Sequence, residues 1–408
     1  MLSQDYLTLE DMDVAGKRVL LRADLNVPVK GGKITDRTRL ERLRPTIEYL
    51  AGQNAKIAIL AHFGRPEGQP VPELSLRPVA EELGRILGIE AAFAKDCVGP
   101  EALEAIAKLR PGGVAVLENT RFHPGEEVND PDLAAHMAAL GDLVVMDAFS
   151  AAHRAHASTG KLLELLPACA GRLMQAELEA LDRALGSPQR PVAAVVGGAK
   201  VSSKLGVLKH LLDKVDLMVL GGGMANTFLA AQGHGIGKSL FESEMLPTAR
   251  AIMNTANERG CRLLLPQDVV VAPALKPDAQ TQTVAADQVP DTQMILDIGP
   301  KSSAEITEEL GKCRTIVWNG PMGVFETPPF DRGTRDVALA VAALTRTQNI
   351  ISVAGGGETV AALAATGQTD NLTYVSTAGG AFLEWLEGRE LPSVALLKQA
   401  KMRAKAAV

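Results

Sequence analysis

Short apolar runs alternate with longer segments of helical periodicity along the whole chain, and this alternation constrains the fold more than any other feature. The runs that we expect to form strands are 18–22, 56–61, 114–118, 143–147, 192–196, 217–220, 262–266, 315–318 and 350–354. Between them, apolar residues recur every three or four positions, which predicts helices at 77–87, 131–140, 204–213, 244–258 and 332–344. Such alternation is typical of an α/β fold, in which helices cover both faces of parallel sheets.

The chain divides most naturally near its middle. Its 408 residues suffice for about two domains of roughly 100–200 residues each. Residues 186–191 combine glycine, serine and two prolines, and they follow a long helical stretch at 173–185. We therefore place a boundary there, with a separate series of strand–helix units on either side. The proline-flanked segment 272–290 predicts an irregular polar loop or a small excursion.

The composition limits the possible classes of protein. Aromatic residues make up only 3% of the chain and apolar residues 46%, so the cores must be aliphatic, as suits parallel sheets. The net charge of −6 argues against sequence-independent nucleic-acid binding, and any anion site must be a local basic cluster. The four cysteines lie far apart in sequence, which predicts buried thiols in a reducing cytosol rather than a zinc site. An acidic N-terminus without an apolar core, and no apolar run of ~18 residues, predict a cytoplasmic protein.

Polar and basic side chains follow four of the expected strands in the N-terminal half. They are Asp24, Asn26 and Arg39 after the first strand, His62 and Arg65 after the second, Arg121 after the third, and Arg154 after the fourth. Each arginine alone is most simply a solvated surface charge, but the loops at the carboxyl ends of parallel strands converge. Arginine binds carboxylate and phosphate oxygens in pairs, so the group predicts a basin for a small polyanion. The histidines leave a general base or a metal site as alternatives, although no carboxylate or cysteine stands at ligand spacing.

Glycines take the corresponding places in the C-terminal half. They follow expected strands in segments 195–204, 220–228, 318–326 and 354–359, the first of which also carries Lys200 and Lys204. Glycine lets backbone N–H groups and a helix N-terminus approach phosphate oxygens. One such junction could be a simple tight turn, but four predict a nucleotide triphosphate site. Residues 235–239 resemble the end of a P-loop, yet Gln232 stands where that motif requires glycine.

Taken together, these segments resemble the successive motifs of the phosphoglycerate kinase family. The motifs are RADLNVP, HFGRP, LENTRFHPGEE, DAFSAAHRAHAS, GGAKVSSK, GGGMANTFL, LLPQDVVVA, LDIGP, VWNGPMGVFE, AGGGET and TAGGAFLEWLEG. The resemblance implies an α/β fold of two doubly wound, Rossmann-like parallel-sheet domains, separated by a cleft and joined by a helix hinge. It implies a substrate domain at 1–172 plus 391–408, a connecting helix at 173–186 and a nucleotide domain at 187–390.

The resemblance also implies roles for individual residues. The substrate-binding residues would be Asp24, Asn26, Arg39, His62, Arg65, Arg121 and Arg154. The nucleotide-binding residues would be Lys204, Gly222, Gly223, Asn319, Glu326, Gly355, Gly356, Gly357, Glu358 and Thr359. Arg39 and Lys200 would contact the phosphoryl group during transfer, and Glu358 would bind Mg²⁺.

Some positions depart from the usual pattern of the family. Glu358 stands where aspartate is common, and it offers a carboxylate to Mg²⁺ with a longer reach. Met146 and Ser150 replace the commoner asparagine and glycine, which changes local hydrogen bonding. Ile295 stands where glycine is frequent and is expected to narrow an adenine pocket, and Ala378 interrupts a run of glycines.

The implied activity is reversible phosphoryl transfer from 1,3-bisphosphoglycerate to ADP, giving 3-phosphoglycerate and ATP, in glycolysis, gluconeogenesis or carbon fixation. We expect direct in-line transfer after domain closure, with Mg²⁺ as cofactor. We also expect a monomer without nucleic-acid or membrane partners. One alternative is a dehydrogenase, which would need a dinucleotide motif that the sequence lacks. The other is a non-catalytic sensor of phosphorylated metabolites, which would not need Lys200, Lys204 or Glu326.

Overall fold

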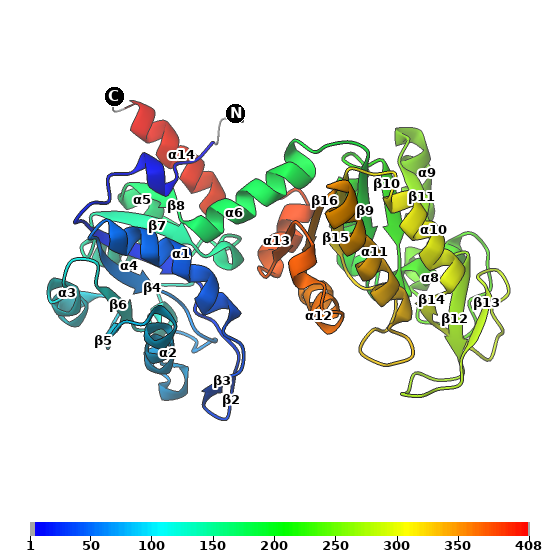
Figure 1. Ribbon diagram of the computed structural model, residues 1–408, viewed down its shortest axis with the longest axis horizontal. Helices are drawn as coiled ribbons and strands as arrows, with labels where there is room; N and C mark the ends of the chain where they lie inside the picture. Colours follow the sequence, from blue (N-terminus) through cyan, green and yellow to red (C-terminus); the bar gives the residue numbers. More distant parts are fainter. Residues whose placement is uncertain (1–4, 407–408) are drawn as a thin grey trace. The chain divides into compact units, whose positions relative to one another are not determined.

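The computed structural model describes residues 5–406, which form two compact units. The N-terminal unit comprises the chain up to Leu178 together with the segment from Glu390 onward, and the C-terminal unit is Glu179–Arg389. Each unit carries its own parallel sheet with helices around it (Figure 1). Residues 1–4 and 407–408 lie outside the described residues. The expected substrate domain includes both segments, and the acidic N-terminus noted in the sequence includes residues 1–4.

The N-terminal unit is built on a six-stranded parallel sheet in the order β5-β6-β4-β1-β7-β8. Its strands are β1 (Arg18–Ala23), β4 (Lys56–Leu60), β5 (Ala92–Ala94), β6 (Val114–Leu117), β7 (Leu143–Asp147) and β8 (Ala168–Ala170). Its helices are α1 (Thr38–Gly52), α2 (Arg77–Leu87), α3 (Gly99–Ala107), α4 (Pro131–Ala138), α5 (Lys161–Leu165) and α14 (Pro392–Ala406). A short hairpin, β2 (Val29–Lys30) and β3 (Lys33–Ile34), follows β1. Because β1 pairs with β4 on one side and β7 on the other, the strand order reverses there, where doubly wound sheets bind ligands.

Helix α14 packs within the N-terminal unit although it follows the whole C-terminal unit in sequence, and it contacts α5 and β8. Ser393, fully buried near its start, donates its N–H to the Ala152 carbonyl at 3.1 Å. The Ser393 hydroxyl donates to the Thr159 carbonyl at 2.8 Å. The loop after β7 is therefore held by residues more than two hundred positions away.

The C-terminal unit has a second six-stranded parallel sheet, in the order β11-β10-β9-β15-β16-β17. Its strands are β9 (Val192–Val196), β10 (Leu217–Leu220), β11 (Arg262–Leu264), β15 (Thr315–Asn319), β16 (Ile351–Gly355) and β17 (Tyr374–Ser376). Its helices are α7 (Leu205–Leu211), α8 (Gly222–Ala231), α9 (Leu246–Arg259), α10 (Pro300–Leu310), α11 (Arg332–Gln348), α12 (Gly357–Ala365) and α13 (Gly380–Leu386). Here the strand order reverses at β9, which lies between β10 and β15.

The central strands are buried along their whole length because helices cover both faces of each sheet. Every residue of β6, β7, β9, β10 and β15 is buried. The core clusters of both units are mainly aliphatic, as the composition predicted, with Phe63 and Trp318 as the aromatic exceptions. The two sheets and their helices confirm the predicted fold class of two doubly wound parallel-sheet units.

Two expectations about individual segments need correction. Residues 272–290 are not simply an irregular loop, since they contain β13 (Gln282–Ala285). This strand joins β12 (Asp268–Ala272) and β14 (Met294–Ile298) in an antiparallel sheet of order β13-β12-β14. The helical stretch at 173–185 is also not one regular α-helix. It comprises α6 (Arg172–Leu181) and then a π-helical turn over Asp182–Gly186.

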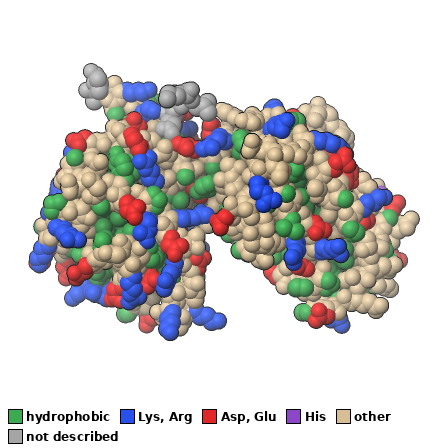
Figure 2. Space-filling model, viewed as in Figure 1, with side chains coloured by type: hydrophobic (Ala, Val, Ile, Leu, Met, Phe, Trp, Pro, Cys, Tyr) green, Lys and Arg blue, Asp and Glu red, His purple; other side chains and the backbone are tan. Residues whose placement is uncertain are grey.

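Acidic and basic side chains are interspersed on the face of each unit that Figure 2 draws. This mixture agrees with the small net charge of −6. Within residues 5–406, the helices are all too short or too polar to cross a membrane.

Candidate active site

Side chains tie together the loops that follow β1, β4 and β6 in the N-terminal unit. Asn26 Oδ1 accepts a hydrogen bond from the Gly64 N–H at 3.0 Å, and Arg121 Nη1 donates to the Gly64 carbonyl at 2.7 Å. Asn119 Oδ1 accepts from the N–H groups of Phe63 and Arg121, each at 3.1 Å. The predicted convergence of these loops is therefore confirmed by direct contacts between them.

The loop after β7 joins the same group through the carboxylate of Asp24. Ser150 Oγ donates to Asp24 Oδ2 at 2.5 Å. Arg39 approaches from α1, with Nη1 3.4 Å from each carboxylate oxygen of Asp24, and it also donates to the Asn26 carbonyl. Asp24 is only 6% exposed. A carboxylate, an arginine and a serine hydroxyl thus meet at the reversal point of the sheet.

Beneath this edge lies an arginine that sequence reasoning did not select. Arg22 lies within β1 and is 1% exposed. Its Nε donates to Ser158 Oγ at 2.7 Å, and Ser158 Oγ lies 2.5 Å from Glu126 Oε1. Glu126 is fully buried and balances the charge of Arg22. An arginine within an otherwise apolar strand was the available signal, because such a residue must find buried partners.

Arg22 also sets the protonation of His62. Arg22 Nη2 lies 3.2 Å from His62 Nδ1, and a guanidinium can only donate, so Nδ1 accepts. Burial and the charges of Arg22, Arg121 and Arg154 hold the pKa of His62 well below its usual value. His62 is therefore neutral, with its ring proton on Nε2, and presents a hydrogen-bond donor rather than a base.

The remaining basic residues of this edge differ in exposure. Arg121 is 4% exposed, with Nε 3.1 Å from Glu127 Oε1, whereas Arg154 is half-buried and Arg65 is exposed. Burial and nearby arginines lower the pKa of His156 to about 4. Such depression of histidine pKa values marks a concentration of positive charge that suits a bound anion.

In the C-terminal unit, Lys204 connects the loops that follow β9 and β15. Its Nζ donates to Asn319 Oδ1 at 2.5 Å and to the Asn319 carbonyl at 3.0 Å. Asn319 Nδ2 in turn donates to the Gly355 carbonyl at 2.8 Å, and the Thr359 hydroxyl accepts from the Gly320 N–H at 2.7 Å. Burial lowers the pKa of Lys204 to about 8, and the negative charge of Glu358 partly offsets this effect. Lys204 and Glu358 are therefore near enough to act on the same ligand.

Glycines allow the backbone segments beside Lys204 to approach closely. Gly222, the first residue of α8, has φ +67°, and a Cβ there would lie 2.6 Å from the Gly198 carbonyl oxygen. Gly223 has equally little room, since its Cβ would lie 2.8 Å from the Ala199 carbonyl oxygen. Gly356 has φ +97°, and a Cβ there would meet the side chain of Asn319 at 2.6 Å. These glycines serve close backbone packing, which keeps helix N-termini accessible to a phosphate chain.

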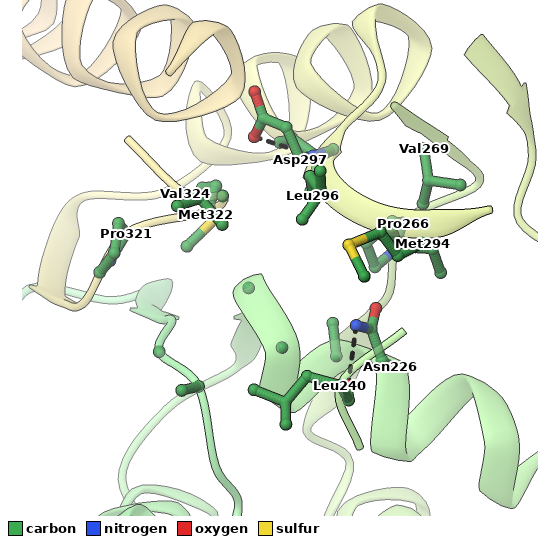
Figure 3. Close-up of a pocket in the computed structure, with 18 of the residues that line it drawn as sticks. Asn226, Leu240, Pro266, Val269, Met294, Leu296, Asp297, Pro321, Met322 and Val324 are labelled. Atoms are coloured by element: carbon green, nitrogen blue, oxygen red, sulfur yellow. Dashed lines mark hydrogen bonds between the residues drawn. The ribbon is translucent and has the colours of Figure 1, made fainter. Parts of the chain in front are cut away.

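An apolar cavity of about 350 Å³ adjoins these glycines (Figure 3). Its lining includes Gly198, Ala199, Gly222, Gly223, Leu240, Val269, Met294, Ile295, Leu296, Met322, Val324, Glu326 and Glu358. Figure 3 shows side chains of the small sheet, such as Leu296 and Met294, on one side and Leu240 on the other. Ile295 does line this cavity, at the position where sequence analysis expected a narrower pocket.

Three predicted charged residues of this unit are exposed. Lys200 lies on the loop after β9, which Glu242 anchors by accepting the Ser202 N–H at 3.0 Å. Glu326 and Glu358 lie at the cavity, and Glu358 is in the first turn of α12 together with the exposed Gly357. Exposed groups of this kind are free to meet a ligand.

One further cluster concerns the metal alternative. Asp96, Cys97 and His123 place potential ligand atoms within 4.8 Å of one another, so His123 does have carboxylate and cysteine neighbours, contrary to the sequence expectation. However, Asp96 Oδ1 already accepts from His123 Nε2 at 2.7 Å and from the N–H groups of Cys97 and Val98. All three of these bonds end on Oδ1, and they hold the turn before α3 in place.

A kinase that acts on a small phosphorylated metabolite is the class of enzyme that this pair of sites fits. The model of the family described as phosphoglycerate kinase matches residues 9–389. Curated proteins named phosphoglycerate kinase are 58% identical in Rhodospirillum centenum and 56% identical in Sinorhizobium medicae. These alignments cover 96% and 97% of this chain and 99% of each relative.

Solved structures agree with this relationship. The structure of phosphoglycerate kinase from Coxiella burnetii has a TM-score of 0.90 at 47% identity, and that from Pyrococcus horikoshii has 0.81 at 34%. Both comparisons cover 97% of this chain and 99% of the other. The chain therefore belongs to the phosphoglycerate kinase family. Its reaction is the reversible transfer of a phosphoryl group between 1,3-bisphosphoglycerate and ADP, which gives 3-phosphoglycerate and ATP in glycolysis.

Proposed function

We propose that the N-terminal unit binds 3-phosphoglycerate or 1,3-bisphosphoglycerate and that the C-terminal unit binds ADP or ATP. One observation carries this proposal. The carboxyl edge of each sheet has its own chemistry, with buried arginines at one and a glycine-lined apolar cavity beside a partly buried lysine at the other. Arginines suit a substrate with several negative charges. An apolar cavity beside a lysine suits a nucleotide, which has an apolar base and a phosphate chain.

In the N-terminal unit, the arginines receive the anionic ends of the substrate. Arg121 is pre-positioned by its bond to Gly64, and Arg154, Arg65 and Arg39 add charge from neighbouring loops. The substrate hydroxyl binds at Asp24 and Asn26. Neutral His62 donates from Nε2 to a substrate oxygen, because its Nδ1 is already occupied by Arg22.

In the C-terminal unit, the apolar cavity receives the adenine ring, flanked by Gly222 and Gly223. Glu326 is exposed beside it and accepts hydrogen bonds from the ribose hydroxyls. The phosphate chain follows toward Lys204, Asn319 and the turn formed by Gly355, Gly356, Gly357, Glu358 and Thr359. A phosphate offers Lys204 the negative charge that its buried position lacks.

Glu358 is the residue that we assign to Mg²⁺. Magnesium in kinases is usually bound by one or two carboxylates together with substrate phosphates and water. Glu358 fits this requirement because its carboxylate is exposed at the cavity and acts electrostatically on Lys204. When bound, the ion would neutralise charge on the nucleotide phosphates.

The transfer itself needs positioning and charge rather than a covalent nucleophile. The acyl phosphate of 1,3-bisphosphoglycerate is attacked in line by an oxygen of ADP, and the carboxylate leaves with little need for a general base. Arg39 and Lys200 neutralise the equatorial oxygens of the phosphoryl group in transit. These residues belong to different units, so the units close on each other during reaction, with α6 and the π-helical turn as the hinge.

An assay of the purified chain with 3-phosphoglycerate, ATP and Mg²⁺ tests whether Arg39 and Lys200 act on the transferred phosphoryl group. It would couple 1,3-bisphosphoglycerate formation to oxidation of a reduced nicotinamide. We expect Arg39→Ala and Lys200→Ala each to lower kcat by about 10²-fold or more, the usual loss on removing a stabilising group in the transition state. Matched controls are the exposed Arg110→Ala and Lys209→Ala, which should retain wild-type rates. Turnover that survives Lys200→Ala would contradict its assignment, and scattering that shows no compaction with both substrates would contradict closure.

We further propose that the chain acts as a cytoplasmic monomer. The proposed site residues of both substrates lie on one chain, and its four cysteines are buried free thiols, as suits a reducing compartment. Light scattering at increasing protein concentration should give a mass near the 43.0 kDa of one chain. A mass of twice that value would contradict a monomer.

A further inference from the structure

Ser150 stands at a position where the sequence analysis expected glycine, and its hydroxyl makes a specific contact. It donates to Asp24 Oδ2 at 2.5 Å, across a separation of 126 residues. A carboxylate can only accept, so the direction of this bond is fixed. A bond to a charged acceptor is among the stronger hydrogen bonds in proteins.

The backbone holds Ser150 in this place. Strands β1 and β7 are neighbours, and Ala23 is paired with Asp147, so the residues that follow the two strands start side by side. Ser150 then lies in a short 3₁₀ helix over Phe149–Ala151, which is closed by a hydrogen bond from the Ala152 N–H to the Phe149 carbonyl at 2.9 Å. The hydroxyl therefore approaches Asp24 from a fixed position.

The two oxygens of Asp24 have different surroundings. Oδ1 accepts from the Asn26 N–H at 3.0 Å, whereas Oδ2 has Ser150 as its close partner. Arg39 Nη1 lies 3.4 Å from both oxygens. Because the terminal torsion of aspartate is broad, loss of Ser150 would let the carboxylate turn toward Arg39. Ser150 opposes that rotation.

We propose that Ser150 is a positioning residue that strengthens the preference of this chain's site for a 2-hydroxy acid, beyond what Asp24 provides where glycine stands at this position. Ser150 occupies one lone pair of Asp24 Oδ2 and fixes the plane of the carboxylate, so that a remaining lone pair faces the hydroxyl of the substrate. This inference rests on the proposed role of Asp24 as acceptor for that hydroxyl. It adds that the orientation of the carboxylate, and not only its charge, determines recognition.

Two ligands that differ by one hydroxyl group test the inference. Dissociation constants of 3-phosphoglycerate and of its 2-deoxy analogue, 3-(phosphonooxy)propionate, would be measured by calorimetry on the full chain. We expect Ser150→Ala to raise the dissociation constant of 3-phosphoglycerate about 3- to 10-fold, which is the effect of losing one hydrogen bond. Binding of 3-(phosphonooxy)propionate should change by less than about 2-fold. Ser150→Thr keeps the hydroxyl and should restore the wild-type preference.

A double-mutant cycle with Asp24→Ala isolates the contact. Once Asp24 is removed, we expect Ser150→Ala to have no further effect on either ligand. Equal weakening of both ligands by Ser150→Ala, or additive effects in the cycle, would overturn the inference and leave the proposed substrate site standing. A wild-type chain that binds both ligands equally would instead overturn the role of Asp24 itself, and with it this inference.

Discussion

Lys204 shows at the scale of one residue how burial acts on a charged group. Its ammonium group is largely buried and donates to both oxygens of Asn319. Burial lowers its pKa to about 8, below the ordinary value of 10.5. Between these two pH values the unfolded chain binds more protons than the folded one, so this lysine makes the free energy of unfolding rise with pH in that window.

Nucleotide binding should therefore be coupled to proton uptake. Phosphate oxygens beside Lys204 favour its charged form and raise its pKa again. At pH 9 we expect binding of Mg-ADP to take up close to one proton, because free Lys204 is then mostly neutral. Calorimetry in buffers of different ionisation enthalpy measures this number. Lys204→Arg, which stays charged, should abolish the uptake, and an unchanged value in that variant would refute the coupling to Lys204.

Individual site residues could be predicted where they follow a strand, since the position of the loop is then known. Asp24, His62 and Arg121 were found in this way and do meet at one edge. Arg22 was missed because it lies inside a strand, and its partner Glu126 lies far away in sequence. Long-range pairs of this kind leave no local pattern, and Asp96 with His123 is another example.

Helix α8 shows at the scale of an element why its first residues are glycines. Gly222 begins the helix with φ +67°, and its N–H donates to the Met322 carbonyl at 2.9 Å. The same residue lines the apolar cavity. The start of the helix, the strand loop beside it and the cavity wall are therefore packed together without room for a side chain.

We expect Gly222→Ala to destabilise the chain by about 1–3 kcal/mol and to weaken ADP binding at least tenfold, because its Cβ would displace the Gly198 carbonyl. Urea unfolding and calorimetry measure the two effects. Gly233→Ala is the matched control, since Gly233 also has positive φ but has open space around it. That control should cost about 1 kcal/mol and leave ADP binding intact. An equal loss of ADP binding in both variants would contradict the steric explanation.

The elements that sequence analysis predicted best are those with a continuous apolar run or a clear helical period. Strand β9 and helix α2 have the expected bounds. Strands β5, β8 and β17 were missed because their apolar runs are short and they gain their structure from pairing at a sheet edge. Strand β11 is equally short, but it was predicted from the run of leucines at 263–265. The helical periodicity at 173–185 likewise gives no sign of the change from α to π geometry.

At the scale of the whole molecule, the N-terminal unit is assembled from two segments that the C-terminal unit separates in sequence. Helix α14 fixes the loop after β7 through Ser393, at both Ala152 and Thr159. Arg154 and His156 lie in that loop. The end of the described chain thus supports part of the proposed substrate site.

Ser393→Ala should therefore affect the substrate rather than the nucleotide. Loss of a buried donor to the Thr159 carbonyl should cost about 1–3 kcal/mol of stability. We expect 3-phosphoglycerate to bind about 3- to 10-fold more weakly, while ADP binding is unchanged. Calorimetry with each ligand checks this, with the exposed Ser243→Ala as control. Equal weakening of both ligands would show that the loop does not transmit the effect.

The position of α14 also determines the order in which the two units can be completed during translation. A ribosome makes the whole of Glu179–Arg389 before it makes α14, so the C-terminal unit has its full sequence while the N-terminal unit still lacks a helix. Domains commonly mature in the order in which they are translated. In this chain the first unit to begin is the last to be completed, so the unit with the proposed nucleotide site has its full sequence before α14 can secure the arginine-rich edge.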